Sequence, residues 1–291
     1  MSHYKPYPAY KDSGVEWLGP VPEHWSISQM KSGIKSLQNG VWGDEPTGGP
    51  DDVPCARVAD FDRIRLIVDE PLPTLRSIPI EQRTYKNVRP GDLLLEKSGG
   101  GEQTTVGAMV QYLGASEIVC SNFVAAVKCK EGVSARWLCY VNSYLYSLGV
   151  NTRSIKQTTG IQNLDSNQYT AEPIAFPTFD EQKAIAAHLD RETSRIDALI
   201  TKKTRFIELL REKRQALITH AVTKGLDPNV KMKDSGVEWL GEVPEGWVVS
   251  RLRYVIRVLT DYTSNGSFAS LAENVTYMRA VSNLKCNTRP C

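Results

Sequence analysis

The sequence lacks any apolar stretch long enough to cross a membrane. A spanning helix needs about 20 consecutive apolar residues, and no apolar run in these 291 residues reaches that length. Residues 1–6 also lack the apolar core of a secretory signal peptide. We therefore expect a cytoplasmic protein without a membrane partner.

Patterns typical of metal sites and disulfide frameworks are missing as well. The 6 cysteines contain no C-x-x-C pair, and the 4 histidines are scattered without the spacing of a metal site. Cys120 and Cys129 lie in apolar, strand-like runs. This usage is typical of reduced, buried thiols in a cytosolic protein, so we expect no disulfide framework and no metal ion.

Signatures of catalysis are also lacking. The chain has no Walker motif and no glycine-rich cofactor fingerprint. It has no Asn/Asp-Pro-Pro-Tyr/Phe motif of methylases, and because Glu96 and Lys97 are adjacent, they do not give the E-x-K spacing of common nucleases. We therefore expect no enzymatic activity and no cofactor of the chain's own.

A large excess of positive charge is missing too. The formal net charge is +2, and residues 1–177 hold 17 basic and 19 acidic side chains. A protein held on nucleic acid mainly by charge would show a heavier basic excess. If this protein reads DNA, it must use a local patch, or a partner must supply much of the phosphate contact.

What the sequence does contain is a long internal repeat. Residues 11–25 (KDSGVEWLGPVPEHW) return as residues 233–247 (KDSGVEWLGEVPEGW), with 13 of 15 positions identical at an offset of 222 residues. That offset exceeds the roughly 20–50 residues of solenoid and propeller repeats. We infer one complete structural unit followed by the beginning of a second, each starting with an ordered loop anchored by two tryptophans.

The first unit is predicted to be strand-rich. Residues 55–62 alternate apolar and polar side chains, as a half-buried strand does, and residues 93–95 form a short apolar strand. Ser134 can cap a helix that runs to about Leu148. Residues 157–160 are expected to form a polar turn.

The clearest predicted element is a very long helix. Thr178 and Glu181 form a capping box, and there is no glycine or proline from Phe179 to about Lys224, after which Gly225 follows. As one straight helix, these 46 residues would span about 70 Å. Such a helix is longer than a domain of about 150 residues is wide.

Apolar side chains recur along this helix in steps of three and four. The predicted seam consists of Ile185, Leu189, Ile196, Leu199, Phe206, Leu210 and Leu217. A stripe of this period is typical of a coiled coil. Because one domain cannot cover the whole stripe, we expect a partner helix, and the corresponding helix of a second copy is the natural candidate.

Six motifs, taken in order, resemble the specificity subunit of type I restriction-modification systems. Each motif alone is weak, but their order and spacing are specific. They are DSGVEWLGxVPExW in the repeat, RVADF at 57–61, GDLLLEKSGGG at 91–101, SNFV at 121–124, QTTGIQNL at 157–164 and PTFDEQKAI at 177–185. The resemblance extends from about Tyr10 to about Val275.

The resemblance implies two target recognition domains in full-length members, each followed by a spacer helix, with the two helices packed antiparallel. Each domain reads one half of a split DNA target. The subunit itself is non-catalytic. It assembles with methylation subunits that use S-adenosylmethionine and with ATP-driven restriction subunits, so these cofactors and Mg would belong to the partners.

The expected fold class is therefore α+β. We expect a mixed α/β recognition domain over residues 1–177, a long coiled-coil spacer helix over 178–230, and the truncated start of a second recognition domain over 231–291. After Tyr277 the family pattern can no longer be aligned, and residues 278–291 resemble a short out-of-frame extension.

Three groups of residues are candidates for DNA contact. Glycines permit close backbone approach, arginine suits guanine edges, and glutamine can read adenine. The candidates are Arg57, Arg63, Lys97, Ser98, Gly99, Gly100, Arg153, Lys156, Gln157 and Thr158. A plain flexible hairpin remains an alternative for the glycine loop, as do local ion pairs for Arg57 and Arg63.

Three functional hypotheses remain open. The first is a half-size specificity subunit that pairs with a second copy and reads a symmetric split site. The second is an interaction module, or decoy, that occupies methylation subunits without binding DNA. The third is the product of a silent, truncated cassette.

Overall fold

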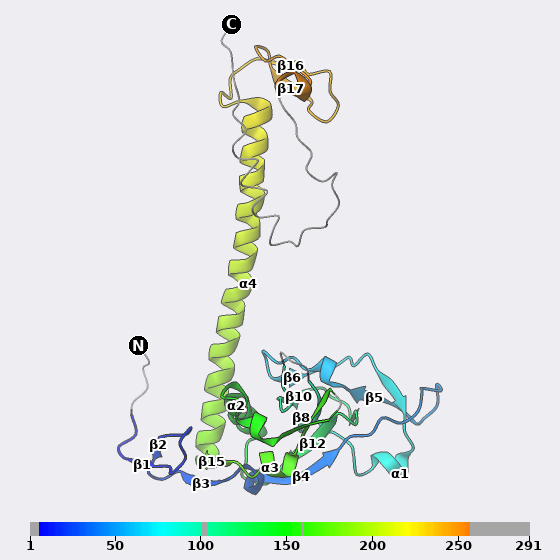
Figure 1. Ribbon diagram of the computed structural model, residues 1–291, viewed down its shortest axis with the longest axis vertical. Coiled ribbons are helices and arrows are strands. Elements are labelled where there is room, and N and C mark those ends of the chain that lie inside the picture. Colours follow the sequence, from blue (N-terminus) through cyan, green and yellow to red (C-terminus); the bar gives the residue numbers. More distant parts are fainter. Residues whose placement is uncertain (1–5, 101–103, 159, 257–291) are drawn as a thin grey trace. The chain divides into compact units, whose positions relative to one another are not determined.

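The computed structural model describes residues 6–100, 104–158 and 160–256 (Figure 1). The chain divides into two compact units, Met1–Ile200 and Thr201–Cys291. Helix α4 (Phe179–Lys224) passes from the first unit into the second. Within the described part of the chain, no helix combines the length and the apolarity needed to span a bilayer.

A five-stranded sheet forms the centre of the first unit. Its strands pair antiparallel except for the last pair, which is parallel. In spatial order they are β4 (Ile34–Asn39), β12 (Val124–Cys129), β8 (Leu93–Glu96), β10 (Met109–Tyr112) and β6 (Ile67–Val68).

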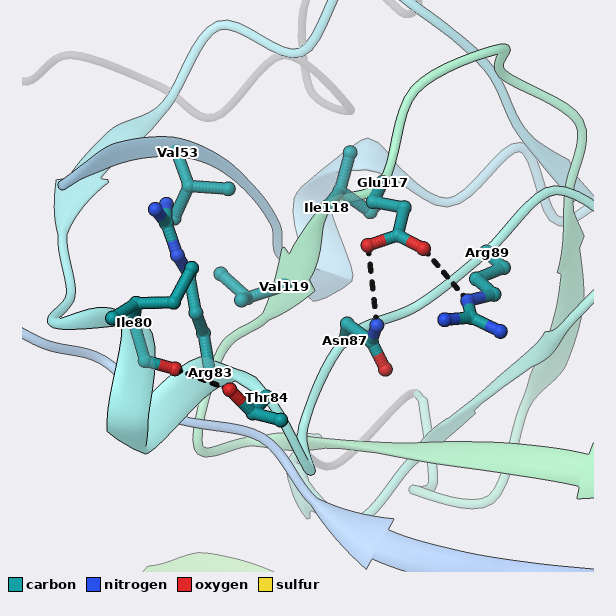
Figure 2. A pocket seen from close by; sticks show the side chains of 9 residues that line it. All are labelled: Val53, Ile80, Arg83, Thr84, Asn87, Arg89, Glu117, Ile118 and Val119. Atoms are coloured by element: carbon teal, nitrogen blue, oxygen red, sulfur yellow. Dashed lines mark hydrogen bonds and ion pairs between the residues drawn. The ribbon is translucent and has the colours of Figure 1, made fainter. Parts of the chain in front are cut away.

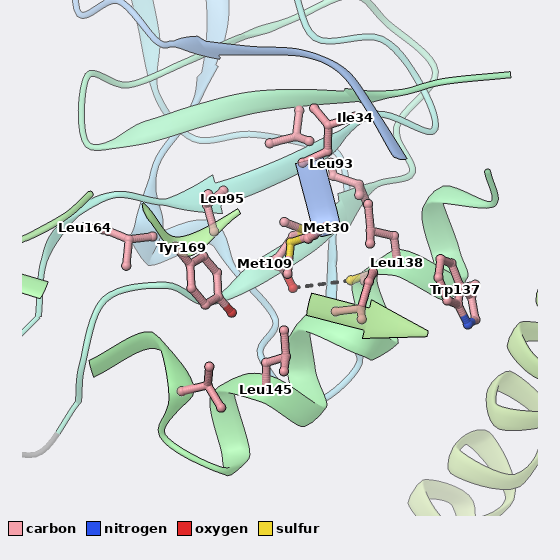
Figure 3. Packing of buried hydrophobic residues seen from close by; sticks show 14 of the residues in the cluster. Met30, Ile34, Leu93, Leu95, Met109, Trp137, Leu138, Leu145, Leu164 and Tyr169 are labelled. Atoms are coloured by element: carbon pink, nitrogen blue, oxygen red, sulfur yellow. Dashed lines mark hydrogen bonds between the residues drawn. The ribbon is translucent and has the colours of Figure 1, made fainter. Parts of the chain in front are cut away.

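Strand β8 supplies side chains to both faces of this sheet. Because side chains alternate along a strand, Leu93 and Leu95 point to one face and Leu94 to the other. The first face packs with Trp137 and Leu138 of helix α2 (Ala135–Ser147) into one buried cluster (Figure 3). Leu94 belongs to a second buried cluster. A hydrophobic layer therefore covers each face of the sheet.

Smaller sheets flank this core. β3 (Ser26–Gln29) pairs with β15 (Pro173–Phe176), next to the first residues of α4. A second small sheet has the order β11 (Val119–Cys120), β5 (Asp52–Ala56), β7 (Leu75–Ser77), and a third has the order β13 (Ile155–Thr158), β14 (Ile161–Leu164), β9 (Ser98–Gly99). The short helices are α1 (Ile80–Arg83) and α3 (Ser166–Tyr169).

Both helices predicted from capping signals are present. The Ser134 side chain accepts a hydrogen bond from the Trp137 N–H, and Gly149 follows α2 with a φ of 70°. At the start of α4 the Glu181 N–H donates to Thr178 Oγ1 at 3.4 Å, and the Thr178 N–H donates to Glu181 Oε2 at 3.0 Å. This reciprocal pair is the predicted capping box.

Two local expectations need correction. The strand expected over residues 55–62 begins earlier and ends at Ala56, because residues 58–60 turn into a short 3-10 helix. The Asp60 side chain stabilises this turn by accepting a hydrogen bond from the Arg57 N–H at 2.7 Å. Gln157 and Thr158, expected in a turn, belong to strand β13.

The first turns of α4 pack on their own unit. Ala186 is buried, Leu189 is half-buried, and Ile185 packs against the core cluster that α2 also contacts. Ile185, predicted to lie in a seam between helices, thus contributes to the core of its own unit. From Ile196 onward the predicted seam residues are exposed.

Arg136 of α2 joins α4 to the rest of this unit. Its Nε–H donates to Asp190 Oδ1 of α4 at 2.7 Å. Its two Nη groups donate to the main-chain oxygens of Leu66 and Arg65, each at 3.0 Å. Tyr140 donates its hydroxyl to the same Asp190 atom at 2.8 Å. One guanidinium therefore links the long helix to α2 and to the chain before β6.

The repeated sequence folds into the same β-hairpin twice, where only an ordered loop had been expected. In the first copy β1 (Tyr10–Asp12) pairs with β2 (Pro20–Pro22), and in the second β16 (Met232–Asp234) pairs with β17 (Glu242–Pro244) in the same register. Gly14 and Gly236 have φ values of 69° and 70°. Nearly identical sequence therefore gives the same hairpin in both units.

Candidate nucleic-acid interface

Two of the predicted groups meet in the small sheet β13–β14–β9. Lys156 pairs with Asn163, which in turn pairs with Ser98, so these three side chains share one face. In the next row Gln157 pairs with Gln162, and Gln162 pairs with Gly99. Residues far apart in sequence are thereby placed side by side.

Hydrogen bonds hold the polar face of this sheet in place. Ser98 Oγ and Asn163 Oδ1 are 2.6 Å apart, and Lys156 Nζ donates to Asp165 Oδ2 at 2.7 Å. The bond from Lys156 is the main cause of the lowered pKa of Asp165. The Lys156 side chain is still largely exposed, at 71%. Its ammonium group is therefore ordered but accessible to a phosphate.

Lys97 occupies the junction between the central sheet and this small one. Its N–H and that of Ser98 both donate to the Phe123 main-chain oxygen, at 2.8 and 3.1 Å. Its Nζ donates to Asn39 Oδ1 at 2.6 Å, and partial burial lowers the pKa of the Lys97 amine. An amine that is partly removed from water gains more from a new anionic partner than a fully solvated one does.

Two glycines are required where the chain leaves β9. Gly99 and Gly100 have φ values of 119° and 66°, which favour glycine. A Cβ atom on Gly100 would also lie 2.8 Å from Gln162 Oε1 and 2.9 Å from the Thr104 main-chain oxygen. Their conformation brings the backbone close to β14.

Arg57 lines a hollow of about 430 Å³ that has mainly apolar walls. The other lining residues are Trp42, Val58, Ala59, Ser121, Asn122 and Phe123. Ser121 is only 2% exposed. Among the described residues, neither Ser121 Oγ nor Arg57 Nε has a hydrogen-bond partner. Arg57 Nε lies 3.7 Å from Asp60 Oδ2 in a local ion pair, which is the alternative left open for Arg57. The Ser121 hydroxyl is buried at the edge of the hollow, where a polar atom without a partner is costly.

Aromatic rings flank this hollow. The Arg76 guanidinium lies over the Trp42 ring, 4.5 Å from the ring centroid, and Arg76 Nε donates to the Trp42 main-chain oxygen. Phe123 is 46% exposed. Since its carbonyl accepts the Lys97 and Ser98 N–H groups, the hollow adjoins the glycine loop. Trp42 and Phe123 were not among the predicted contact residues, although Phe123 lies in the SNFV motif.

Arg63 forms a buried ion pair. Its Nη2 donates to both carboxylate oxygens of Glu96 at 2.9 Å, and Glu96 is 1% exposed. Burial raises the pKa of Glu96, although Arg63 opposes the shift. This geometry favours the ion-pair alternative for Arg63, with Glu96 as the partner instead of the neighbouring aspartates.

The remaining predicted residues lie elsewhere or are only partly described. Arg153 lines another hollow, together with Trp17 and Glu172. Thr158 lies in β13, but its side chain falls outside the part of the structure that is described.

A further hollow of about 410 Å³ has mixed polar and apolar walls, with two arginines and one carboxylate among its lining residues (Figure 2). Glu117 accepts a hydrogen bond from Asn87 Nδ2 at 3.2 Å and one from Arg89 Nε at 2.7 Å, and these bonds lower the pKa of Glu117. Arg83 donates to the Pro50 main-chain oxygen. The hollow therefore contains one ion pair, between Arg89 and Glu117, and the further positive charge of Arg83.

Within the described ranges, no three His, Cys, Asp or Glu residues lie close enough together to hold a metal ion. Cys55, Cys120 and Cys139 are buried and free, and burial raises their pKa values to about 11, 12 and 12. These thiols therefore stay protonated and unreactive near neutral pH.

Comparison with known proteins identifies the relatives of this chain. No protein-family model matches it. A protein named as the specificity subunit of the type I restriction enzyme MjaX of Methanocaldococcus jannaschii is 22% identical over 269 residues, which are 90% of this chain and 60% of the relative. The MjaVIII specificity subunit of the same organism is 28% identical over 142 residues, which are 45% of this chain and 32% of the relative.

The chain is a homologue of type I specificity subunits. Its fold agrees with a solved chain from a study of the assembly and conformational transition of the type I restriction-modification system, at a TM-score of 0.52 and 19% identity. That match covers 75% of this chain and 49% of the solved one. The specificity-subunit homologue thus spans less than two thirds of the length of each of these relatives. The predicted fold class and family resemblance are both confirmed.

Proposed function

We propose that this specificity-subunit homologue is the non-catalytic DNA-recognition subunit of a type I restriction-modification complex. The observation that supports this most directly is that Lys156 and Ser98 share one face of a small sheet, with Lys97 next to Ser98 and the hollow adjoining it, in a chain whose relatives are specificity subunits. The first unit would read one half of a split target in double-stranded DNA.

Lys97, Lys156 and the residues of the hollow can supply both kinds of contact that DNA recognition needs, to phosphates and to base edges. Exposed or partly buried lysines contact phosphates and set position, while side chains in a groove read base edges. The Arg57 guanidinium, on a side chain that is 40% exposed, offers hydrogen bonds from the hollow, and Phe123 offers an apolar surface for a thymine methyl group. We assign phosphate contact to Lys97 and Lys156, and base reading to the hollow.

We also propose that two copies pair through α4. Ile196, Leu199, Phe206, Leu210 and Leu217 are between 49% and 61% exposed, and they follow one stripe of the helix. An antiparallel partner helix would remove this stripe from water, with a gain of about 25 cal/mol per Å² of apolar surface. Two identical recognition domains would then read a symmetric, split site.

The remaining partners are assigned by homology. We propose that the chain assembles with methylation subunits and a restriction subunit, and that S-adenosylmethionine, ATP and Mg bind to those subunits. Such a complex would act on DNA in the cytoplasm. A decoy that occupies methylation subunits without binding DNA remains the second candidate, because residues 1–177 carry more acidic than basic side chains.

Genome-wide mapping of adenine methylation tests this proposal. Cells would express the chain with its cognate methylation subunit, and a new split palindromic motif is the expected result. A motif that is not symmetric would contradict the pairing. No new methylation, with both proteins soluble and associated and with no specific retardation of DNA, would support the decoy.

Variants in the hollow sharpen the test. Arg57→Ala and Phe123→Ala should relax the methylated motif at one position, since a good base contact contributes about 1–3 kcal/mol of discrimination. Arg89→Ala is the matched control, because its exposed guanidinium pairs with Glu117 away from the glycine loop. An unchanged motif in both hollow variants would remove the hollow from base reading.

A further inference from the structure

The two copies of the hairpin differ in what covers them. Trp17, in the N-terminal hairpin (residues 10–25), packs against the core cluster of its unit, and its ring centroid lies 6.3 Å from that of Tyr144. The Tyr144 hydroxyl donates to the Trp17 main-chain oxygen at 3.3 Å. Its counterpart Trp239, in the C-terminal hairpin (residues 232–247), is 83% exposed.

The site of the N-terminal hairpin has a second half at the start of α4. His24 Nε2 lies 2.8 Å from Glu181 Oε1, and the Trp25 Nε1–H points to the same oxygen at 3.5 Å. Together, Tyr144 and Glu181 form a docking site that holds the repeated sequence at its middle, through Trp17, and at its end, through His24 and Trp25. We call this the hairpin site.

The C-terminal hairpin has nearly everything needed to fill this site. Its internal hydrogen bonds reproduce those of the first copy: Gly236 N–H to Asp234 Oδ1 at 3.0 Å, and Val237 N–H to Ser235 Oγ at 3.1 Å. Trp239 and Trp247 stand where Trp17 and Trp25 stand. The repeat changes only two residues, and the one that matters here is His24, which becomes Gly246.

The C-terminal hairpin lies at the other end of α4. Lys224 Nζ donates to the Glu242 main-chain oxygen at 2.6 Å, and a Cβ atom on Gly225 would lie 3.5 Å from the Trp247 ring. In an antiparallel pair of α4 helices, the end of one helix lies beside the start of the other. The C-terminal hairpin of each chain would then lie near the hairpin site of its partner.

We infer that the C-terminal hairpin is a second ligand for the hairpin site, and that it competes there, on a second copy of the chain, with that copy's own N-terminal hairpin. This inference rests on the proposed pairing through α4. The N-terminal hairpin holds the site for most of the time, because only it carries His24 and because it continues directly into strand β3. Exchange between the two hairpins would couple the chains at both ends of the helix pair.

A cross-linking experiment between two singly labelled full-length chains tests the exchange. One chain carries Ser147→Cys, one turn of α2 beyond Tyr144, and the other carries Glu238→Cys, next to Trp239. Both positions are exposed. Cys286 and Cys291 are replaced by serine in both chains, and a short bis-maleimide joins only chains whose hairpin and site meet in trans.

Two controls set the scale. A single chain with Glu16→Cys and Ser147→Cys reports the native contact of the N-terminal hairpin. It also shows that the reagent can span the distance between the hairpin and α2. Chains without an added cysteine report any reaction of the native thiols. The expected result is a cross-linked heterodimer in the mixture of the two labelled chains.

Hairpin variants decide whether the cross-link reflects exchange. His24→Gly in the Ser147→Cys chain makes both hairpins alike at this position and should raise the yield about two- to fivefold, the range of one exposed ion pair. Trp239→Ala in the Glu238→Cys chain should abolish the product. A yield that responds to neither change would mean chance proximity and would overturn the inference.

Light scattering on the same samples separates this inference from the proposed function. Dimers that give no hairpin-dependent cross-link would leave the α4 pairing intact and overturn the exchange alone. Monomers would overturn both. If the thiol introduced by Glu238→Cys were protected from a small maleimide without any cross-link, residues of the same chain would cover Trp239, which also overturns the exchange.

Discussion

His24 Nε2 lies 2.8 Å from Glu181 Oε1, although 157 residues separate the two side chains in sequence. Glu181 Oε2 accepts from the Thr178 N–H and hydroxyl in the capping box of α4. The Glu181 carboxylate therefore both anchors the end of the N-terminal hairpin and caps the start of the long helix. Burial alone would raise the pKa of Glu181, but the hydrogen bonds from His24, Thr178 and Trp25 lower it to about 2.

Glu181→Gln should lower the free energy of unfolding near neutral pH by about 1 kcal/mol, the usual contribution of a helix cap. A carboxyl group whose pKa is depressed on folding stabilises the protein above its unfolded pKa. That contribution is lost as the pH falls from about 4.5 to about 2. Urea titrations of both proteins across this range should therefore converge at the acidic end.

Asp180→Asn is the control for this prediction. Asp180 is also in the first turn of α4, but its side chain is 90% exposed and forms an ion pair with Lys183, its neighbour on the same helix. Its effect should be small at every pH. An equal loss of stability in both variants would mean that the general charge of the helix start, and not the Glu181 contacts, is responsible.

Arg63→Ala should destabilise the first unit by about 3 kcal/mol, because it leaves Glu96 buried and unpaired. The measurement is chemical denaturation at neutral pH. Adding Glu96→Gln to Arg63→Ala should restore part of the loss, since a neutral amide is cheaper to bury than a carboxylate. If Arg63→Ala kept full stability but changed the methylated motif, Arg63 would be a base-reading residue after all.

Leu199→Asp should break the proposed pairing of α4 helices. Leu199 is 52% exposed in the single chain, so the folded monomer tolerates the change. In a helix pair the carboxylate would be buried without a partner, and the dissociation constant should rise at least about 100-fold. Light scattering over a range of concentrations measures this.

Thr204→Asp provides the matched control on the same helix, since Thr204 is exposed and lies outside the seam. It should leave dimers intact. Dimers that survive Leu199→Asp would place the interface on another surface.

Lys97→Ala should weaken DNA binding by a similar factor for all sequences and reduce the salt dependence by about one phosphate contact. Retardation assays at several salt concentrations would show this in the complex with the methylation subunit. Lys130→Ala, an exposed lysine just after β12, should leave the slope unchanged. Equal slopes in wild type and Lys97→Ala would assign Lys97 to the Asn39 contact alone.

The helices were predictable because their signals are local. The caps at Ser134 and at Thr178 use residues within one turn, and the glycines that follow each helix are adjacent in sequence. The apolar run of Leu93, Leu94 and Leu95 likewise predicted a short strand. Such patterns depend only on neighbouring residues.

What the sequence could not predict depends on contacts between distant residues. The pairing of Ser98 with Asn163, which makes one surface of two predicted groups, is set by strand register. The partner of Arg63 is Glu96 on another strand, not the aspartates beside it. At Arg57 a 3-10 turn replaces the expected end of the strand. The residues of this turn line the hollow together with Trp42 and Phe123.

The guanidinium of Arg136 has a mechanical consequence. It donates to Asp190 on the long helix and, at the same time, to two main-chain oxygens that lie just before the edge strand of the central sheet. Any tilt of the helix against the sheet would break at least one of these charged hydrogen bonds. A load applied along the helix would therefore be passed to the edge of the central sheet as strain.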